Sequence, residues 1–276
     1  MSFKANRPVK TSLKTFEIIE QLSHTDRVRL SRLAEELDES KGIVHNHLST
    51  LRELGYVRKI GDRYQLSPKL LSVGFRARSQ SRLFTAGRPP LSELTDRLDA
   101  GVVLCEPAST ECIVTDSQRL PEGLDIDVGT AIPISESLPG LVVAVAAADE
   151  GSTDTTAEHE PAADRESVDA HGSTIEHEPA AEYDLAAIGE ALTEQGYAVG
   201  PLTSATAVDC IAVPVVDEAG DCYGSAGVLL PADVSEQRSQ QLIEAAVQLR
   251  TRIETRLDSG WESTRSFATE KHSWIS

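Results

Sequence analysis

The sequence predicts an α+β fold in two domains joined by a linker helix, and three observations predict it. Short amphipathic helices followed by a hairpin pattern occupy the first 75 residues. From Gly101 onward, pairs of apolar strands are mixed with helices, which is typical of a domain built on an antiparallel sheet. The charge also changes sign near residue 90, and 40% of the 276 residues are apolar, which is enough for two cores.

The distribution of charge separates the two domains. A formal net charge of −18 would by itself argue against a nucleic-acid partner. Residues 1–90, however, hold 17 Lys and Arg against 9 Asp and Glu, a balance of +8. Residues 91–276 hold the other 9 basic and 35 acidic residues, a balance of −26. A basic module on an acidic domain indicates a polyanionic partner; two merely solvated surfaces are the alternative.

Composition also predicts the environment of the protein. Only 7 of the basic residues are Lys and 19 are Arg, acids are abundant, and Phe, Trp and Met are scarce. This composition resembles that of proteins from salt-accumulating archaea, so we expect a halophilic source. The sequence has no apolar stretch long enough to span a membrane and no secretory signal, which favours a cytoplasmic protein without a membrane partner. The four cysteines lack metal-binding spacing and are expected to be reduced and buried: Cys105, Cys112, Cys210 and Cys222.

Two amphipathic helices begin the chain. Residues 11–23 place apolar side chains on one predicted stripe: Leu13, Phe16, Ile19 and Leu22. The segment LSRLAEEL repeats the pattern with Leu30, Leu33, Ala34 and Leu37, and Ser31 is a candidate N-cap. A turn at residues 38–40 follows.

A third helix and a hairpin complete the first domain. The segment SKGIVHNHLSTLRELG predicts a helix that turns Val44, Leu48 and Leu51 inward and stops at Gly55. The segment YVRKIGDRYQLS predicts two short strands around Gly61-Asp62. Helix, helix, turn, helix and hairpin are the elements of a winged helix-turn-helix.

This order of elements favours DNA binding for a geometric reason. The second helix of the pair enters the major groove, and the hairpin, or wing, follows the sugar-phosphate backbone. Polar side chains on the outer face of the third helix can pair with base edges, and cations on the wing suit phosphates. The candidate DNA-binding residues are Arg27, Arg29, Ser40, Lys41, His45, Asn46, Ser49, Arg52, Arg58, Lys59 and Arg63. A winged helix that docks onto protein and binds no operator is the alternative.

The second half of the chain predicts a sensor domain. We place the winged helix at 1–75, a linker helix at 76–98 with a break at Arg88-Pro89-Pro90, the sensor domain at 99–257 and a tail at 258–276. Its expected elements are a hairpin (GVVLCEP, ECIVTD), a buried helix (LPGLVVAVAAA), an amphipathic helix ending at Gly196, a second hairpin (CIAVPVVD, CYGSAGVLL) and a helix from about Ser235 to Leu257.

An acidic segment interrupts this domain. Residues 149–182 hold 11 acidic residues and one Arg, and they repeat the sequence EHEPAA. Such a composition cannot bury enough apolar surface to fold, so we expect a flexible, solvated loop. Its histidines, which could instead collect a cation among the carboxylates, are His159, His171 and His177.

The motifs of common enzyme classes are missing from the sequence. It has no phosphate-binding GxxxxGK loop, no dinucleotide-binding GxGxxG after a strand, no HExxH and no GxSxG. Asp125-Ile126-Asp127 is a weak carboxylate pattern, and His45 and His47 are two apart on a helix and face different directions. We therefore expect a protein that is not an enzyme and uses no cofactor or metal.

Several of these segments resemble the IclR-type transcription regulators. The resemblance is carried by LSRLAEEL followed by SKGIVHNHLSTLRELGYV, by RYQLSPKLLSVG after the wing, and by EQGYAVG and DCIAVPVVDEAG in the second half. It implies a homodimer or homotetramer, a palindromic duplex operator, and a GAF-like effector domain that binds a small organic acid, sugar acid or aromatic acid to control catabolic genes.

The resemblance also assigns candidate effector-binding residues, with departures from the family pattern. The family's pocket cysteine falls on Cys210 and the glycine before its buried helix on Gly140. Gly227 replaces a serine that often lines the last strand, and Ser225 lies near it. Asn46 and His47 stand where Arg and Leu are frequent in the family, so its base preference does not transfer to this chain.

Overall fold

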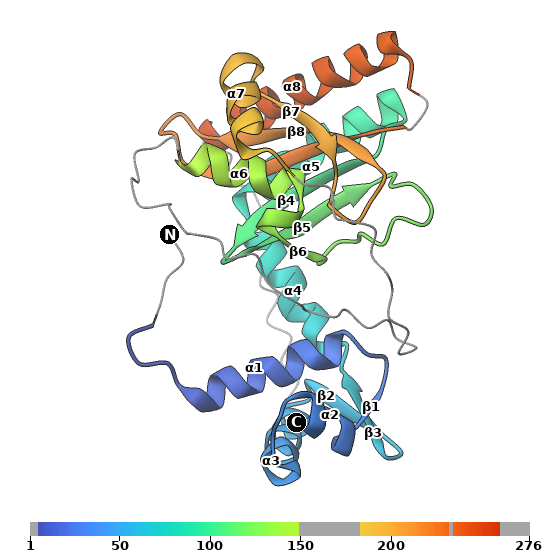
Figure 1. The fold of residues 1–276 in the computed structure, drawn as a ribbon, viewed down its shortest axis with the longest axis vertical. Helices are drawn as coiled ribbons and strands as arrows, with labels where there is room; N and C mark the ends of the chain where they lie inside the picture. Colours follow the sequence, from blue (N-terminus) through green and yellow to red (C-terminus); the bar gives the residue numbers. More distant parts are fainter. Residues whose placement is uncertain (1–4, 149–182, 232–233, 260–276) are drawn as a thin grey trace, which may run out of the picture. The chain divides into compact units, whose positions relative to one another are not determined.

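The computed structural model describes residues 5–148, 183–231 and 234–259, and these residues form two compact units (Figure 1). The predicted acidic loop at 149–182 and its three histidines lie outside the described residues, as does most of the predicted tail. We call the described residues up to Gln80 the first unit and those from Ser81 onward the second unit. The α+β fold class is confirmed.

The first unit has the predicted order of helices and hairpin. Its elements are α1 (Lys10–Ser23), β1 (Val28–Arg29), α2 (Leu30–Glu36), α3 (Lys41–Glu53), β2 (Val57–Ile60), β3 (Arg63–Leu66) and α4 (Lys69–Gln80). The hairpin β2–β3 turns at Gly61-Asp62, and β1 joins it in a small antiparallel sheet of order β1-β3-β2. The apolar core of this unit gathers Ile18, Leu22, Leu33, Ala34, Val44, Leu48, Leu51, Val57 and Tyr64.

Two details of the first helices differ from prediction. Leu13 and Phe16 are 51% and 63% exposed, and Ile18 is buried together with Leu22 instead. Apolar residues lie on two sides of α1, and the core takes only one of them. Ser31 is not the N-cap of α2, because the helix already begins at Leu30 and follows directly from β1.

The second unit is built around one antiparallel sheet. Its elements are α5 (Arg82–Leu98), β4 (Val102–Ala108), β5 (Glu111–Gln118), β6 (Ala131–Pro133), the 3-10 turn η1 (Ile134–Glu136), α6 (Leu138–Ala148), α7 (Leu185–Gln195), β7 (Ala198–Pro201), β8 (Asp209–Val216), β9 (Cys222–Leu230) and α8 (Glu236–Asp258). The six strands follow the order β6-β5-β4-β9-β8-β7, and every neighbouring pair is antiparallel. Both predicted hairpins are therefore confirmed as β4–β5 and β8–β9.

Helices cover both faces of this sheet (Figure 1). Val102 and Leu104 of β4 pack into the core that contains α5 and α8. Val103 and Cys105 point the other way, into the core beneath α6 and α7. Consecutive strand residues face opposite sides, so a strand covered on both sides is apolar throughout. The predicted stop of α7 is confirmed at Gly196, whose φ of 77° is a left-handed conformation that suits glycine.

The predicted break at Arg88-Pro89-Pro90 is wrong. α5 runs without interruption from Arg82 to Leu98, and the chain instead breaks at Ser81. Ser81 caps α5, since its Oγ accepts a hydrogen bond from the Phe84 amide at 2.9 Å. The segment 76–98 thus belongs to two helices, α4 and α5.

Metal-binding clusters, membrane-spanning helices and the state of the cysteines can each be checked in the described residues. Across the described ranges, His, Cys, Asp and Glu side chains do not gather in threes in a metal-binding arrangement. Among the helices of the described residues, none combines the length and apolar character that a membrane crossing needs. The cysteines are free thiols, and Cys222 is half-buried where we predicted it buried.

Candidate nucleic-acid interface

Helix α3 presents one polar face to solvent because its apolar residues recur with the helical period. Val44, Leu48 and Leu51 are at most 3% exposed and fix the helix to the core of the first unit. Ser40 begins the helix as an N-cap, with its Oγ accepting from the Ile43 amide at 3.3 Å. The hydroxyl of Ser40 therefore serves the helix start, although we predicted it as a DNA contact.

The predicted base-reading side chains lie on the outer face of α3. Lys41, His45 and Asn46 are exposed, and Ser49 is half-buried. Two neighbours orient the helix: His47 Nδ1 lies 2.9 Å from Thr15 Oγ1 of α1, and Lys69 Nζ donates at 2.6 Å to the Leu54 carbonyl at the end of α3. The helix is thus held at both its flank and its C-terminus while the polar face stays open.

A groove of about 610 Å³ separates α3 from the wing. It brings together four of the predicted DNA-binding residues, which are Ser49, Arg52, Arg58 and Lys59. Lys59 Nζ lies 5.3 Å from the centroid of the Tyr64 ring, a cation–π contact that positions the ammonium group on the wing. The cationic rim of this groove can accept an anionic backbone.

Sequence reasoning did not identify three further residues that line this groove: Glu53, Val57 and Ile60. Helical spacing from Ser49 would have placed Glu53 on the same face, one turn onward. Ile60 lies at the end of β2 and is 44% exposed, on the outward face that strand alternation from the buried Val57 assigns to it. Ile43, an exposed apolar residue in the first turn of α3, was likewise not predicted to belong to the site.

Two predicted phosphate contacts already have protein partners. Arg27 Nε donates to Gln65 Oε1 at 3.0 Å, and Arg29 Nε donates to Asp62 Oδ2 at 2.6 Å. This bond from Arg29 lowers the pKa of the Asp62 carboxyl. Both arginines thus connect the start of α2 to the wing, where Arg63 stays exposed opposite Arg29.

The predicted effector-binding residues all lie in the second unit: Gly140 lies in α6, and Cys210, Ser225 and Gly227 lie on the face of the sheet beneath it. Ser225 is fully buried, and its Oγ donates to the Pro139 carbonyl at 2.9 Å. A Cβ on Gly227 would lie 3.7 Å from Pro139 Cγ, so Ser225 and Gly227 meet α6 at the same place. A Cβ on Gly140 would lie 2.9 Å from the Ile134 carbonyl, so only glycine lets this turn of α6 approach η1.

Cys210 lies beside this cluster on β8. It pairs with Leu229 of β9, two residues beyond Gly227, and it is fully buried. Burial raises the pKa of the Cys210 thiol, which keeps it protonated and unreactive. The structure thus brings the four residues together where α6 packs on the sheet, and the Ser225 hydroxyl is already bonded there.

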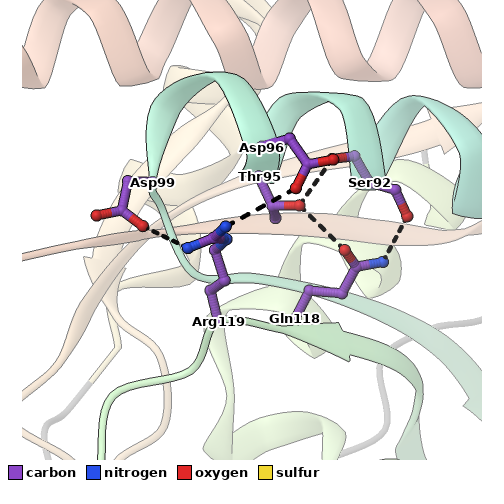
Figure 2. Close-up of polar contacts among 6 residues, drawn as sticks. All are labelled: Ser92, Thr95, Asp96, Asp99, Gln118 and Arg119. Atoms are coloured by element: carbon purple, nitrogen blue, oxygen red, sulfur yellow. Dashed lines mark hydrogen bonds and ion pairs between the residues drawn. The ribbon is translucent and has the colours of Figure 1, made fainter.

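A polar network holds the C-terminal part of α5 to the end of β5 (Figure 2). The buried Thr95 donates through Oγ1 to Gln118 Oε1 at 3.0 Å, and Gln118 Nε2 donates to Ser92 Oγ at 3.0 Å. Beside them, Arg119 forms ion pairs with Asp99 at 2.6 Å and with Asp96 at 3.8 Å. The amide and hydroxyl groups are satisfied internally, which fixes α5 on the sheet.

Comparison with known proteins finds a family match within the first unit. Residues 13–61 match the model of the IclR helix-turn-helix domain. The regulator ArcR of Halobacterium salinarum is 29% identical over 122 residues, which cover 40% of this chain and 46% of ArcR. KdgR of Escherichia coli, an HTH-type transcriptional regulator, is 25% identical over 242 residues, which cover 85% of this chain and 88% of KdgR.

Solved structures share the fold over most of the chain. An IclR transcriptional regulator from Alicyclobacillus acidocaldarius has a TM-score of 0.70 at 18% identity, covering 90% of this chain and 99% of that one. An IclR homologue from Microbacterium hydrocarbonoxydans, complexed with 4-hydroxybenzoate, has a TM-score of 0.61 at 15% identity, covering 88% of this chain and 98% of that one. At these identities the likeness establishes the fold.

Proposed function

We infer that the chain is an IclR-family transcriptional regulator that binds duplex DNA through α3 and the wing and responds to a small molecule bound in its second unit. The observation that carries this inference is the groove between α3 and β2, with Ser49 and Arg52 on one side and Arg58 and Lys59 on the other. Base-edge donors on a helix beside cations on a hairpin match the two surfaces of a duplex.

The side chains divide between base contacts and phosphate contacts. On α3, the proposed base-reading residues are Lys41, His45, Asn46 and Ser49. The proposed phosphate contacts are Arg52, Arg58, Lys59 and Arg63, which are exposed around the groove and the wing. Because Arg27 and Arg29 are bonded to Gln65 and Asp62, we assign them a smaller share of the phosphate contacts than the sequence suggested.

A homodimer is the proposed assembly. In α4 no residue is buried, and Leu71 and Phe75 lie one turn apart with exposures of 60% and 57%. On α1, Leu13 and Phe16 add a second exposed apolar stripe. A second copy of the chain would cover these faces, and a two-fold dimer requires an operator with inverted symmetry. A homotetramer would pair two such dimers.

The proposed effector is a small organic acid, sugar acid or aromatic acid that controls a catabolic pathway; an IclR homologue with a similar fold is complexed with the aromatic acid 4-hydroxybenzoate. The candidate contacts are Gly140, Cys210, Ser225 and Gly227, gathered beneath α6. A ligand that takes a hydrogen bond from Ser225 must replace the Pro139 carbonyl as its partner and thereby move α6. Thermal-shift screening with the three acid classes identifies the ligand. The Ser225→Ala variant should then show a smaller ligand-induced rise in melting temperature than the wild type.

The acidic composition supports a cytoplasmic protein adapted to concentrated salt. Near 1 M salt the Debye length falls to about 3 Å, so the acidic residues cannot repel DNA at range. Phosphate contacts are weakened in the same medium, which leaves a larger share of binding to base edges and shape. We expect the fold to be lost in dilute buffer and regained on adding salt, as followed by circular dichroism.

Footprinting on DNA from the protein's own gene neighbourhood tests the proposed function. The expected result is a protected inverted repeat whose half-sites lie about one helical turn apart. Absence of protection on any neighbouring DNA, with the protein folded and in its native salt, would favour a winged helix that docks onto protein.

A further inference from the structure

The first turn of α3 exposes an apolar side chain among polar ones. Ile43 is 44% exposed, whereas its neighbour Val44 is fully buried in the core of the first unit. Val44 fills the inward position of the helical period, so Ile43 points away from the core. Burial within this unit therefore does not explain the branched aliphatic residue at the start of the helix that the proposed function places in the major groove.

The surroundings of Ile43 leave it accessible to a duplex. Ser40 Oγ accepts a hydrogen bond from the Ile43 amide and sets the start of the helix. The preceding residue, Gly42, has room around it, since an added Cβ would meet only Ser40 Oγ, at 4.0 Å. Asn46 lies three residues onward and is exposed, which places its amide beside Ile43 on the same side of the helix.

Major-groove chemistry assigns a partner to each of these two side chains. The thymine 5-methyl is the apolar group that a natural base pair presents in the major groove, and a carboxamide can pair bidentately with adenine N6 and N7. An aliphatic side chain one turn from an asparagine therefore matches a site where thymine and adenine are neighbours. Gly42 lets the helix backbone come close enough for both contacts.

We infer that Ile43 contacts a thymine methyl group and that Asn46 reads an adjacent adenine, so that the first turns of α3 select A·T pairs. This inference rests on the proposed function and names the bases that the proposed interface recognises. It adds Ile43 to the specificity-determining residues, because its methyl groups gain contact only where thymine supplies a methyl.

Deoxyuridine scanning of the operator tests the thymine contact. Replacing dT by dU removes only the methyl group, and at one position per half-site we expect affinity to fall about fourfold, as for one buried methyl group. Ile43→Ala should lower affinity for the dT operator and then show no further loss with dU at that position. As a control, Leu185→Ala removes an exposed aliphatic side chain from α7 of the second unit, away from the proposed interface, and should leave the dU effect in place.

A second analogue tests the adenine contact. Replacing dA by 7-deaza-dA removes the N7 acceptor, and Asn46→Ala should abolish the sensitivity to this change at one position per half-site. Firm operator binding that is insensitive to dU at every position would overturn the inference about Ile43 and leave the proposed function intact. Absence of sequence-specific binding by the wild-type protein would instead count against the proposed function itself.

Discussion

Arg256 of α8 donates a hydrogen bond from Nε to the Ala86 carbonyl of α5 at 2.9 Å. Ala86 lies four residues before Pro90, and proline has no amide hydrogen to offer the carbonyl at that position. The guanidinium therefore occupies the place of the missing helical bond. This contact satisfies the carbonyl that Pro90 leaves without a helical partner, and it joins α5 to α8.

Removing Arg256 should destabilise the second unit. We expect Arg256→Ala to lower the free energy of unfolding by about 1.5–3 kcal/mol, the range for a hydrogen bond from a charged donor, as measured by denaturant titration. Arg252→Ala is the control, because its ion pair with Glu93 is exposed and should contribute less than about 1 kcal/mol.

A double-mutant cycle isolates the helical carbonyl. Pro90→Ala restores an amide donor for Ala86, so Arg256→Ala should cost less in that background than in the wild type. Equal losses in the two backgrounds would contradict the proposed link between the proline and the arginine.

The network in Figure 2 predicts a second stability effect. Thr95 is 1% exposed and shares its hydroxyl hydrogen between Gln118 Oε1 and the Ser92 carbonyl. Thr95→Val keeps the volume but strands the Gln118 acceptor, at an expected cost of about 1–3 kcal/mol. Thr251→Val removes an exposed hydroxyl that bonds only within α8, and calorimetry should show a much smaller change.

Glu106 predicts a pH dependence. Burial is the main cause that raises the pKa of its carboxyl above the ordinary value, while hydrogen bonds from Ser81 and Thr115 act in the opposite direction. Because the folded protein then holds this proton more readily than the unfolded chain, the contribution of Glu106 to the free energy of unfolding falls as the pH rises through its pKa.

Glu106→Gln removes this titration and keeps an acceptor for Ser81 Oγ, which donates to Glu106 at 2.6 Å. The free energy of unfolding of the variant minus that of the wild type should therefore increase as the pH rises from acidic to neutral. Denaturant midpoints across the pH range measure the difference. Glu111→Gln, on the exposed start of β5, removes the same charge, and an identical pH profile for the two variants would refute the prediction.

The parts of the fold that the sequence predicts well are those with a simple pattern and clear stop signals. α3 repeats with the helical period, and the strands of the two sheet hairpins are short apolar runs separated by turn residues, so their bounds follow from local rules. In α1, two apolar sides compete, and only the assembled core shows that Ile18 is buried and Phe16 is not. In α5, the carbonyl that Pro90 leaves free is bonded by Arg256, a residue 170 positions away, which local rules do not reveal.

In the candidate site, too, some features follow from local sequence patterns and others depend on tertiary contacts. Helical periodicity places Lys41, Asn46 and Ser49 on the outer face of α3 because Val44 and Leu48 must face inward. The bonds that engage Arg27 and Arg29 come from the wing across the small sheet, and they depend on strand register. The sequence likewise did not show that Ser225 is bonded to α6.

The affinity of the protein for its footprinted operator tests the central claim most directly. Lys41→Ala, Asn46→Ala and Arg58→Ala combined should weaken binding at least about a hundredfold, since they remove two base contacts and one phosphate contact. A control variant with Lys10→Ala and Arg32→Ala also loses two positive charges, but from α1 and α2, and it should bind the operator with an affinity close to that of the wild type. Fluorescence anisotropy in native salt measures both. Unchanged operator affinity of the triple variant would contradict the assignment of α3 and the wing as the DNA-binding surface.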